Sequence, residues 1–129
     1  MVFLDSDVLI NFLRKDPKTI NLFERLRSEE EDLSITSVNS FELLKGVSKS
    51  SNMDRSKVME FLSSFEIYNF EFESSKEAAL IFEDLKSIRE MIELPDIMIA
   101  SIVIANNGKI ITGNINHFKR IKNLEVEEL

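Results

Sequence analysis

Short apolar runs rich in β-branched or aromatic residues alternate along this chain with longer stretches of helical periodicity, and this alternation constrains the fold most. The strand-like runs are Val2–Leu4, Leu33–Ile35, Ile67–Phe70, Ile110–Thr112 and, more weakly, Leu124–Val126. Helical spacing of apolar residues fills the intervals, over Val8–Arg14, Lys18–Arg27, Val38–Lys49, Asp54–Phe65, Ser75–Met91 and Pro95–Asn106. Strands that alternate with helices form a parallel sheet that is covered on both faces. The sequence therefore predicts an α/β fold, a three-layer α/β/α sandwich around a central parallel sheet of about five strands.

The composition predicts a single domain over residues 1–129. The sequence has three glycines and two prolines, and no repeat, linker or low-complexity tract divides it. It contains no cysteine, which excludes disulfides, zinc-thiolate sites and thiol nucleophiles and fits a cytoplasmic protein. The longest apolar run, Ile97–Ala105, is far shorter than the roughly 20 residues of a membrane span, and no signal peptide is recognisable. We therefore expect no membrane partner.

The net charge limits how the chain can meet nucleic acid. It is −7, from 23 acidic residues against 16 lysines and arginines. This balance argues against tight, non-specific binding to nucleic acid through charge alone. Any role on nucleic acid therefore requires bound cations or a local basic patch.

Acidic residues lie where predicted strands end. Asp5 and Asp7 follow the first apolar run, and an unpaired carboxylate inside a buried strand costs several kcal/mol, so the strand ends at Asp5. Glu42 lies in the helix after the second run, Asp96 opens the helix before the fourth run, and Asn114 follows the fourth run. Ligands of parallel sheets bind outside the carboxyl ends of the strands, near the point where the strand order reverses. We expect these polar groups to converge at one end of the sheet.

Such a cluster of carboxylates predicts a metal site. Carboxylates that are brought together repel and raise one another's pKa unless cations intervene, so a cluster drawn from distant segments favours Mg²⁺ or Mn²⁺. Two such ions about 3.5–4 Å apart activate a water and stabilise the leaving oxygen when a phosphodiester is displaced in line. This is nuclease chemistry that needs no protein nucleophile.

The chain resembles the PIN-domain ribonucleases, in particular the VapC-type toxins of toxin–antitoxin pairs. Their successive motifs match, in order, the segments "FLDSDVLINFL", "SITSVNSFELLKGV", "IELPDIMIASIVIANNGKIITGNINHF" and "NLEVEEL". The match spans nearly the whole chain. The resemblance implies a compact α/β/α fold, a divalent-metal-dependent endoribonuclease that hydrolyses RNA phosphodiester bonds, a cognate antitoxin that blocks the site, and a homodimer.

The resemblance also implies roles for single residues. Asp5, Glu42 and Asp96 match the three acids that the family uses to hold Mg²⁺ or Mn²⁺ and to catalyse cleavage. Asn114 falls at the last position of the "T-x-[DN]" stretch, where many PIN domains have a fourth acid. We therefore expect Asn114 to be a further, weaker metal ligand.

Neighbours of these acids are expected to support the metal ligands. Ser6 matches the hydroxyl residue beside the first acid, Asp7 matches the next position of that motif, and Thr112 belongs to the stretch before Asn114. Simpler interpretations stay open. In the first of them, Asp7 caps the first helix. In the second, Asp96 only complements the dipole of the helix that it opens.

Basic residues near the acids are candidates for contact with RNA phosphates. Lys45 and Lys49 follow Glu42 at i+3 and i+7, so they share one stripe of a helix. A rim is predicted to continue through Arg14, Lys15, Lys119, Arg120 and Lys122. Ordinary surface salt bridges are the alternative explanation for these side chains.

The sole histidine, His117, has no carboxylate or second histidine at catalytic spacing, so we expect it at a helix start without a chemical role. The Phe-rich segments around Phe61, Phe65 and Phe82 are expected to form core or dimer contacts and not base-stacking platforms.

Three alternatives to a toxin remain at this stage. One is an RNA-processing PIN nuclease outside a toxin–antitoxin pair, and another is a PIN scaffold with weak catalysis that binds a partner. The third is a receiver-type signalling module with an acidic Mg²⁺ pocket. A receiver places its phospho-accepting aspartate after the third strand, whereas this chain offers Glu71 and Glu73 there.

Overall fold

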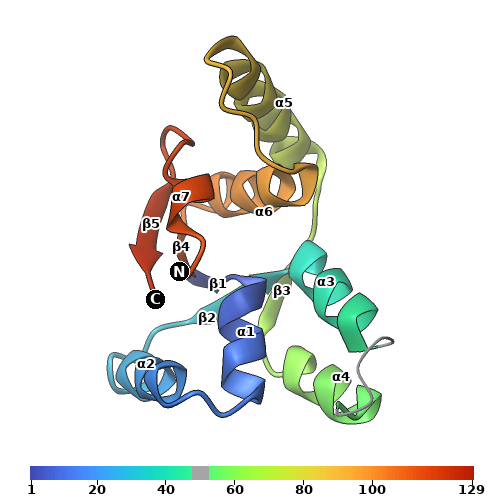
Figure 1. Ribbon diagram of the computed structural model, residues 1–129, viewed down its shortest axis with the longest axis vertical. Helices are drawn as coiled ribbons and strands as arrows, with labels where there is room; N and C mark the ends of the chain where they lie inside the picture. Colours follow the sequence, from blue (N-terminus) through green and yellow to red (C-terminus); the bar gives the residue numbers. More distant parts are fainter. Residues whose placement is uncertain (48–52) are drawn as a thin grey trace.

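A sheet of five parallel strands forms the middle layer of the molecule (Figure 1). The computed structural model describes residues 1–47 and 53–129. In these ranges the strands are β1 (Val2–Leu4), β2 (Leu33–Thr36), β3 (Glu66–Tyr68), β4 (Lys109–Thr112) and β5 (Glu125–Glu128). They lie in the order β3-β2-β1-β4-β5, and each neighbouring pair is parallel. The order reverses between β1 and β4, which is where such sheets bind ligands.

Helices cover both faces of the sheet, which confirms the predicted three-layer α/β/α fold (Figure 1). In the described ranges they are α1 (Ser6–Leu13), α2 (Pro17–Ser28), α3 (Ser37–Val47), α4 (Arg55–Ser63), α5 (Phe72–Ser87), α6 (Leu94–Ala105) and α7 (Ile115–Phe118). His117, which we expected at a helix start, lies in α7. This helix has four residues and is too short to be recognised from the periodicity of the sequence. Among the described residues, no helix combines the length and the apolar character that crossing a membrane requires.

The central strand β1 is buried on both sides because its side chains alternate between two cores. Val2 and Leu4 pack with Leu9 of α1, whereas Phe3 between them packs with Ile99 of α6. Burial of each large apolar side chain stabilises the fold by about 1.5–3 kcal/mol. This two-sided burial explains why the first run of the sequence is continuously apolar, and it forces the first acid to the end of the strand.

Aromatic rings join the helices on the α1 face of the sheet. Phe12 stacks on Phe23 and on Phe61, with ring centroids 4.1 and 5.4 Å apart, and Phe65 meets Phe61 edge-on at 5.1 Å. The expectation that Phe61 and Phe65 serve the core is therefore confirmed, since both pack against the buried cluster. Phe82 differs, because its side chain is 40% exposed.

In the turn after α6, the left-handed backbone conformation is adopted by Asn107, with a φ of 54°, and not by the glycine that follows it. The Gly108 N–H donates to the Val103 carbonyl at 3.0 Å. Glycine is needed at 108 for space, because a Cβ there would lie 2.7 Å from the buried ring of Phe3.

Candidate metal-dependent nuclease site

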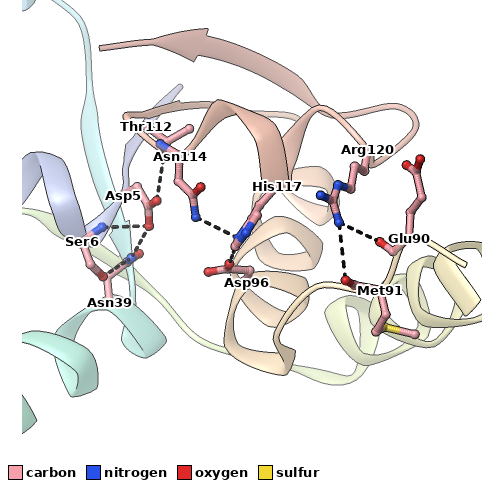
Figure 2. Close-up of polar contacts among 10 residues, drawn as sticks. All are labelled: Asp5, Ser6, Asn39, Glu90, Met91, Asp96, Thr112, Asn114, His117 and Arg120. Atoms are coloured by element: carbon pink, nitrogen blue, oxygen red, sulfur yellow. Dashed lines mark hydrogen bonds and ion pairs between the residues drawn. The ribbon is translucent and has the colours of Figure 1, made fainter.

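Asp5 marks the junction of β1 and α1 and is held from two sides (Figure 2). Its Oδ1 accepts the Ser6 N–H at 2.8 Å, which makes Asp5 the N-cap of α1. Its Oδ2 accepts the Thr112 hydroxyl at 2.7 Å, and that hydroxyl accepts the Asn114 N–H at 2.9 Å. Parallel pairing of Leu4 with Ile111 brings the two strand ends together. The position of the first predicted ligand is thus set by sheet pairing.

The environment of Asp5 disfavours its negative charge. The residue is only 6% exposed, and burial raises the pKa of its carboxyl to about 7, with the negative charges of Asp7 and Asp96 acting in the same direction. The hydrogen bonds from Thr112 and Ser6 oppose this shift but do not cancel it. A cation beside the carboxylate would favour the charged form.

Glu42 is connected to Asp5 through the side chains of α1 and α3. The Ser6 hydroxyl donates to Glu42 Oε1 at 2.7 Å. Asn39 donates its amide hydrogens to Ser6 Oγ at 2.9 Å and to Asp5 Oδ1 at 3.4 Å. The predicted supporting role of Ser6 therefore has a geometric basis, since Ser6 orients one acid and lies beside the other.

Asn39 is a residue of this site that the sequence analysis missed. It is completely buried, and its Oδ1 accepts both the backbone N–H of Thr36, at 3.0 Å, and the Thr36 hydroxyl, at 2.7 Å. The Thr36 hydroxyl in turn accepts the Asn39 N–H at 3.1 Å. A signal was present, because Asn39 follows a strand-ending threonine at i+3 and precedes Glu42 at i+3 on α3.

Asp7 does not cap α1, so that simpler interpretation is wrong. Its Oδ2 accepts the Gly113 N–H at 2.9 Å and thereby joins α1 to the turn after β4. Its Oδ1 is buried and has no hydrogen-bond partner among the described residues. Burial raises the pKa of Asp7, and Asp96 adds to the shift. Asp7 therefore adds buried negative charge beside Asp5.

Asp96 lies in the first turn of α6 and faces α7 (Figure 2). Its Oδ2 is 2.9 Å from His117 Nδ1, and Asn114 Nδ2 is 2.8 Å from the same ring nitrogen. The sequence offered no acidic partner for His117, because Asp96 is 21 residues away in the chain. The structure gives it one. Asn114 occupies the N-cap position of α7 but makes no side-chain capping bond, and its amide is directed at the histidine.

The structure brings the predicted acids together only in part. The charges of Asp7 and Asp96 help to raise the pKa of Asp5, and Glu42 is joined to Asp5 through Ser6. Within residues 1–47 and 53–129, however, no three acids or histidines are arranged ready to hold one ion. The side chains of Glu42 and Asp96 instead make hydrogen-bonding contacts with Ser6 and His117.

The predicted basic rim is interrupted. Lys45 is exposed on α3, with its Nζ 5.6 Å from the ring centroid of Phe41, and it lines a hollow of about 350 Å³ together with Glu42. Lys49 lies outside the described residues. Arg120 donates to the carbonyl oxygens of Glu90 and Met91, at 3.3 and 3.5 Å (Figure 2), and Lys122 lies 3.3 Å from Asp84. These two side chains therefore face the end of α5.

Comparison with known proteins identifies the family. The sequence model of the PIN domain family matches residues 2–124 of this chain. The chain belongs to the PIN domain family. A relative of this PIN domain, Ribonuclease VapC2 of Rickettsia felis, is 32% identical over 126 residues, which are 96% of this chain and 94% of the relative. The assignment excludes the receiver-type alternative.

Solved structures agree with the family assignment. VapBC2 from Rickettsia felis, solved bound to a DNA fragment from their promoter, contains a chain that superimposes on this PIN domain with a TM-score of 0.89 at 31% identity, covering 100% of this chain and 99% of that one. A chain of DNA-bound VapBC from Salmonella typhimurium has the same fold, with a TM-score of 0.87 at 23% identity over 98% of this chain and 96% of its own.

The donors of this PIN domain fit a hard divalent cation. Asp5, Glu42 and Asp96 offer carboxylate oxygens, which Mg²⁺ and Mn²⁺ prefer to nitrogen or sulfur. The charges that act on Asp5 are those of Asp7 and Asp96, and both are negative. A buried Asp7 oxygen without a partner in the described chain adds to this excess. A cation at this point would offset the charge.

Proposed function

We propose that this protein is a divalent-metal-dependent endoribonuclease that hydrolyses RNA phosphodiester bonds as the toxin of a toxin–antitoxin pair. The observation that carries the proposal is that Asp7 and Asp96 lie near Asp5 where the strand order reverses between β1 and β4. The relative that is 32% identical is named a ribonuclease, and the structural neighbour at 31% identity belongs to a VapBC complex. The first supports activity on RNA, and the second supports a partner in a VapBC complex.

In this proposal Asp5, Glu42 and Asp96 are the catalytic acids and hold Mg²⁺ or Mn²⁺. Asn114 offers a neutral amide oxygen as a further, weaker ligand. When bound, the cation supplies a Lewis acid that lowers the pKa of a water and stabilises the leaving oxygen of the phosphodiester. Titration with Mg²⁺ and with Mn²⁺ measures which ion is preferred and how many are bound.

The chain's own residues orient the acids. Thr112 and the Ser6 N–H each bind one oxygen of Asp5, so its carboxylate is fixed before any ligand arrives. The Ser6 hydroxyl turns Glu42 toward the same junction. Asp7 holds the Gly113 N–H and so fixes the turn after β4. Lys45, next to Glu42 on α3, binds RNA phosphates in this proposal, and Lys49 is its predicted companion.

The proposal includes partners. A cognate antitoxin covers the acidic site, since the structural neighbour at 31% identity was solved as part of a VapBC complex, and the active protein is a homodimer in the cytoplasm. Growth arrest on expression, relieved by co-expression of the small open reading frame next to this gene, would support the toxin. Cleavage without any such inhibitor would favour an RNA-processing PIN nuclease outside a toxin–antitoxin pair.

The decisive experiment is Asp96→Asn. Loss of one ligand charge at a partly exposed helix start should abolish metal-dependent RNA cleavage and leave the fold intact, which an RNA cleavage assay and circular dichroism measure together. Asp84→Asn is the matched control, because Asp84 lies on α5 and pairs with Lys122. Full cleavage by the folded Asp96→Asn variant would refute the assignment, and absence of cleavage in the unaltered protein with Mg²⁺ or Mn²⁺ would favour a binding scaffold.

A further inference from the structure

His117 and Asp96 form a contact between two helices that the proposed ligand set does not include. The imidazole Nδ1 of α7 lies 2.9 Å from Asp96 Oδ2 of α6, and the two side chains are 37% and 17% exposed. We propose that His117 is a positioning residue that holds the Asp96 carboxylate in the orientation required for a divalent cation. The proposal rests on the metal-dependent function above and deepens it.

The geometry of the carboxylate explains why such a residue is needed. Asp96 lies in the first turn of α6, whose following residues Ile97 and Ile99 are buried in the core, so the backbone at this point is fixed. The side chain itself can still rotate, because a partly exposed aspartate has several rotamers. A hydrogen bond from Nδ1 to Oδ2 removes this freedom and leaves Oδ1 for the cation. Carboxylates that bind metals are commonly held by such outer hydrogen bonds.

Asn114 provides the second half of the arrangement. Its Nδ2 lies 2.8 Å from the same ring nitrogen, so the amide flanks the imidazole and limits its rotation (Figure 2). In the tautomer that this proposal assigns, Nδ1–H donates to the charged carboxylate, so the Asn114 amide flanks the ring without donating its own hydrogen to Nδ1. The amide can turn its oxygen or its nitrogen toward the ring by a half-rotation. Asp96 is thus oriented by His117, and His117 by Asn114.

A merely structural pair would behave differently. Half-exposed ion pairs contribute little to stability, so a structural role would appear, if at all, in the thermal unfolding of the metal-free protein. A positioning role appears instead in metal affinity. The two roles are therefore separated by measuring metal binding and unfolding on the same variants.

Two amide substitutions of His117 test the role. The side-chain nitrogen of His117→Asn falls near the place of Nδ1, whereas that of His117→Gln falls near the place of Nε2. Isothermal titration of the full-length protein with Mn²⁺ should show about 10–100-fold weaker binding in His117→Gln, the range found when outer hydrogen-bond partners of metal ligands are removed. Binding in His117→Asn should stay within about threefold of the unaltered protein, since its donor is retained.

Controls make the outcome decisive. Asn116→Ala, at the exposed neighbouring position of α7, should bind Mn²⁺ normally. Melting in chelator should be the same for all three variants, and excess Mn²⁺ should restore cleavage by His117→Gln. Unaltered Mn²⁺ affinity in His117→Gln would overturn the proposal, as would an equal loss in both amide variants.

The failure of this inference can be distinguished from failure of the proposed function. If the unaltered protein binds Mn²⁺ and Asp96→Asn does not, while His117→Gln binds normally, only the role of His117 is wrong. If the unaltered protein binds no Mn²⁺, or Asp96→Asn cleaves RNA fully, the metal-dependent function and the inference fall together.

Discussion

The two sides of the acidic site are built in different ways. On the β1 side, Asp5 is buried, and its oxygens are bound by a backbone amide, by a hydroxyl at the end of β4 and by the amide of Asn39. On the α6 side, Asp96 is partly exposed and is contacted by His117, itself a partly exposed side chain. The first side is fixed by strand pairing, whereas the second depends on a contact between two helix ends.

This difference has an energetic consequence. Burial of Asp5 close to Asp7 and Asp96 raises its pKa, which means that the ionised site is less stable than the same acids in water. The unfavourable free energy of ionising Asp5 therefore lies on the β1 side, where strand pairing fixes the backbone. The partly exposed side, with Asp96 and Asn114, can adjust when a cation or a phosphate arrives. We expect changes on the buried side to affect folding and function together, and changes on the exposed side to affect function mainly.

The largest effect is expected from Asp5→Asn. Cleavage should fall by on the order of 100-fold or more, since loss of even an outer partner of a metal ligand costs 10–100-fold. The metal-free protein should nevertheless melt at a higher temperature at pH 8, because the amide removes a buried charge that is unfavourable in the fold. Cleavage assays and melting in chelator measure the two effects. If the melting temperature of metal-free Asp5→Asn is much lower than that of the unaltered protein, the charge of Asp5 itself stabilises the β1 side.

The pH dependence of stability should reveal the same residue. The Asp5 carboxyl titrates near 3.8 when unfolded and near 7 when folded, so between these values the folded protein binds more protons. Its contribution to the free energy of unfolding therefore decreases as pH rises from about 4 to about 7 and is constant beyond. Urea unfolding in chelator across this range, compared with Asp5→Asn, isolates the effect. Identical pH profiles for both proteins would contradict the assignment.

Asn39→Ala, on the β1 side, should lower the free energy of unfolding more than a matched substitution on the α6 side. It leaves the buried N–H and hydroxyl of Thr36 without their acceptor, so the free energy of unfolding should fall by about 1–3 kcal/mol. Asn114→Ala, the same change on the exposed side, should cost about 0.5 kcal/mol or less. Urea unfolding with chelator compares them. Equal losses would show that both sides are similarly fixed.

These residues also show how far the sequence predicted the site. The end of β1 was predictable, because a buried run cannot contain an unpaired carboxylate, and the position of Asp5 followed from that rule. The resemblance to the PIN family, and not this rule, indicated Thr112. The partners of Asn39 and His117 were not readable. Asn39 meets Asp5 across 34 residues and His117 meets Asp96 across 21, so neither contact leaves a local periodicity. The five-strand order likewise required the structure, although the alternation of elements predicted a parallel sheet.

Asn114→Asp should change the exposed side in a moderate way. A fourth carboxylate should tighten Mn²⁺ binding about 30-fold, because one unit negative charge about 4 Å from a dication contributes about 2 kcal/mol in water. It should also lower the melting temperature of the metal-free protein, since a like charge joins Asp5, Asp7 and Asp96. Calorimetric titration and melting in chelator measure both. If neither quantity changes, Asn114 serves only the turn and His117, and the metal ligands are the three acids alone.

The smallest effect is expected from Lys45→Ala, which tests whether the buried side also guides RNA. Lys45 lies one helical turn from Glu42 on α3, whereas Arg120, on the other side, is directed to the carbonyl oxygens of Glu90 and Met91. In an Asp96→Asn background that leaves RNA uncleaved, Lys45→Ala should reduce the slope of log affinity against log salt by about 0.7–1, the value for one phosphate contact. Arg120→Ala should leave the slope unchanged, because its guanidinium already has protein acceptors. An unchanged slope in Lys45→Ala would show that Lys45 does not contact an RNA phosphate. A reduced slope in Arg120→Ala would show that the RNA instead binds on the α6 side of the acids.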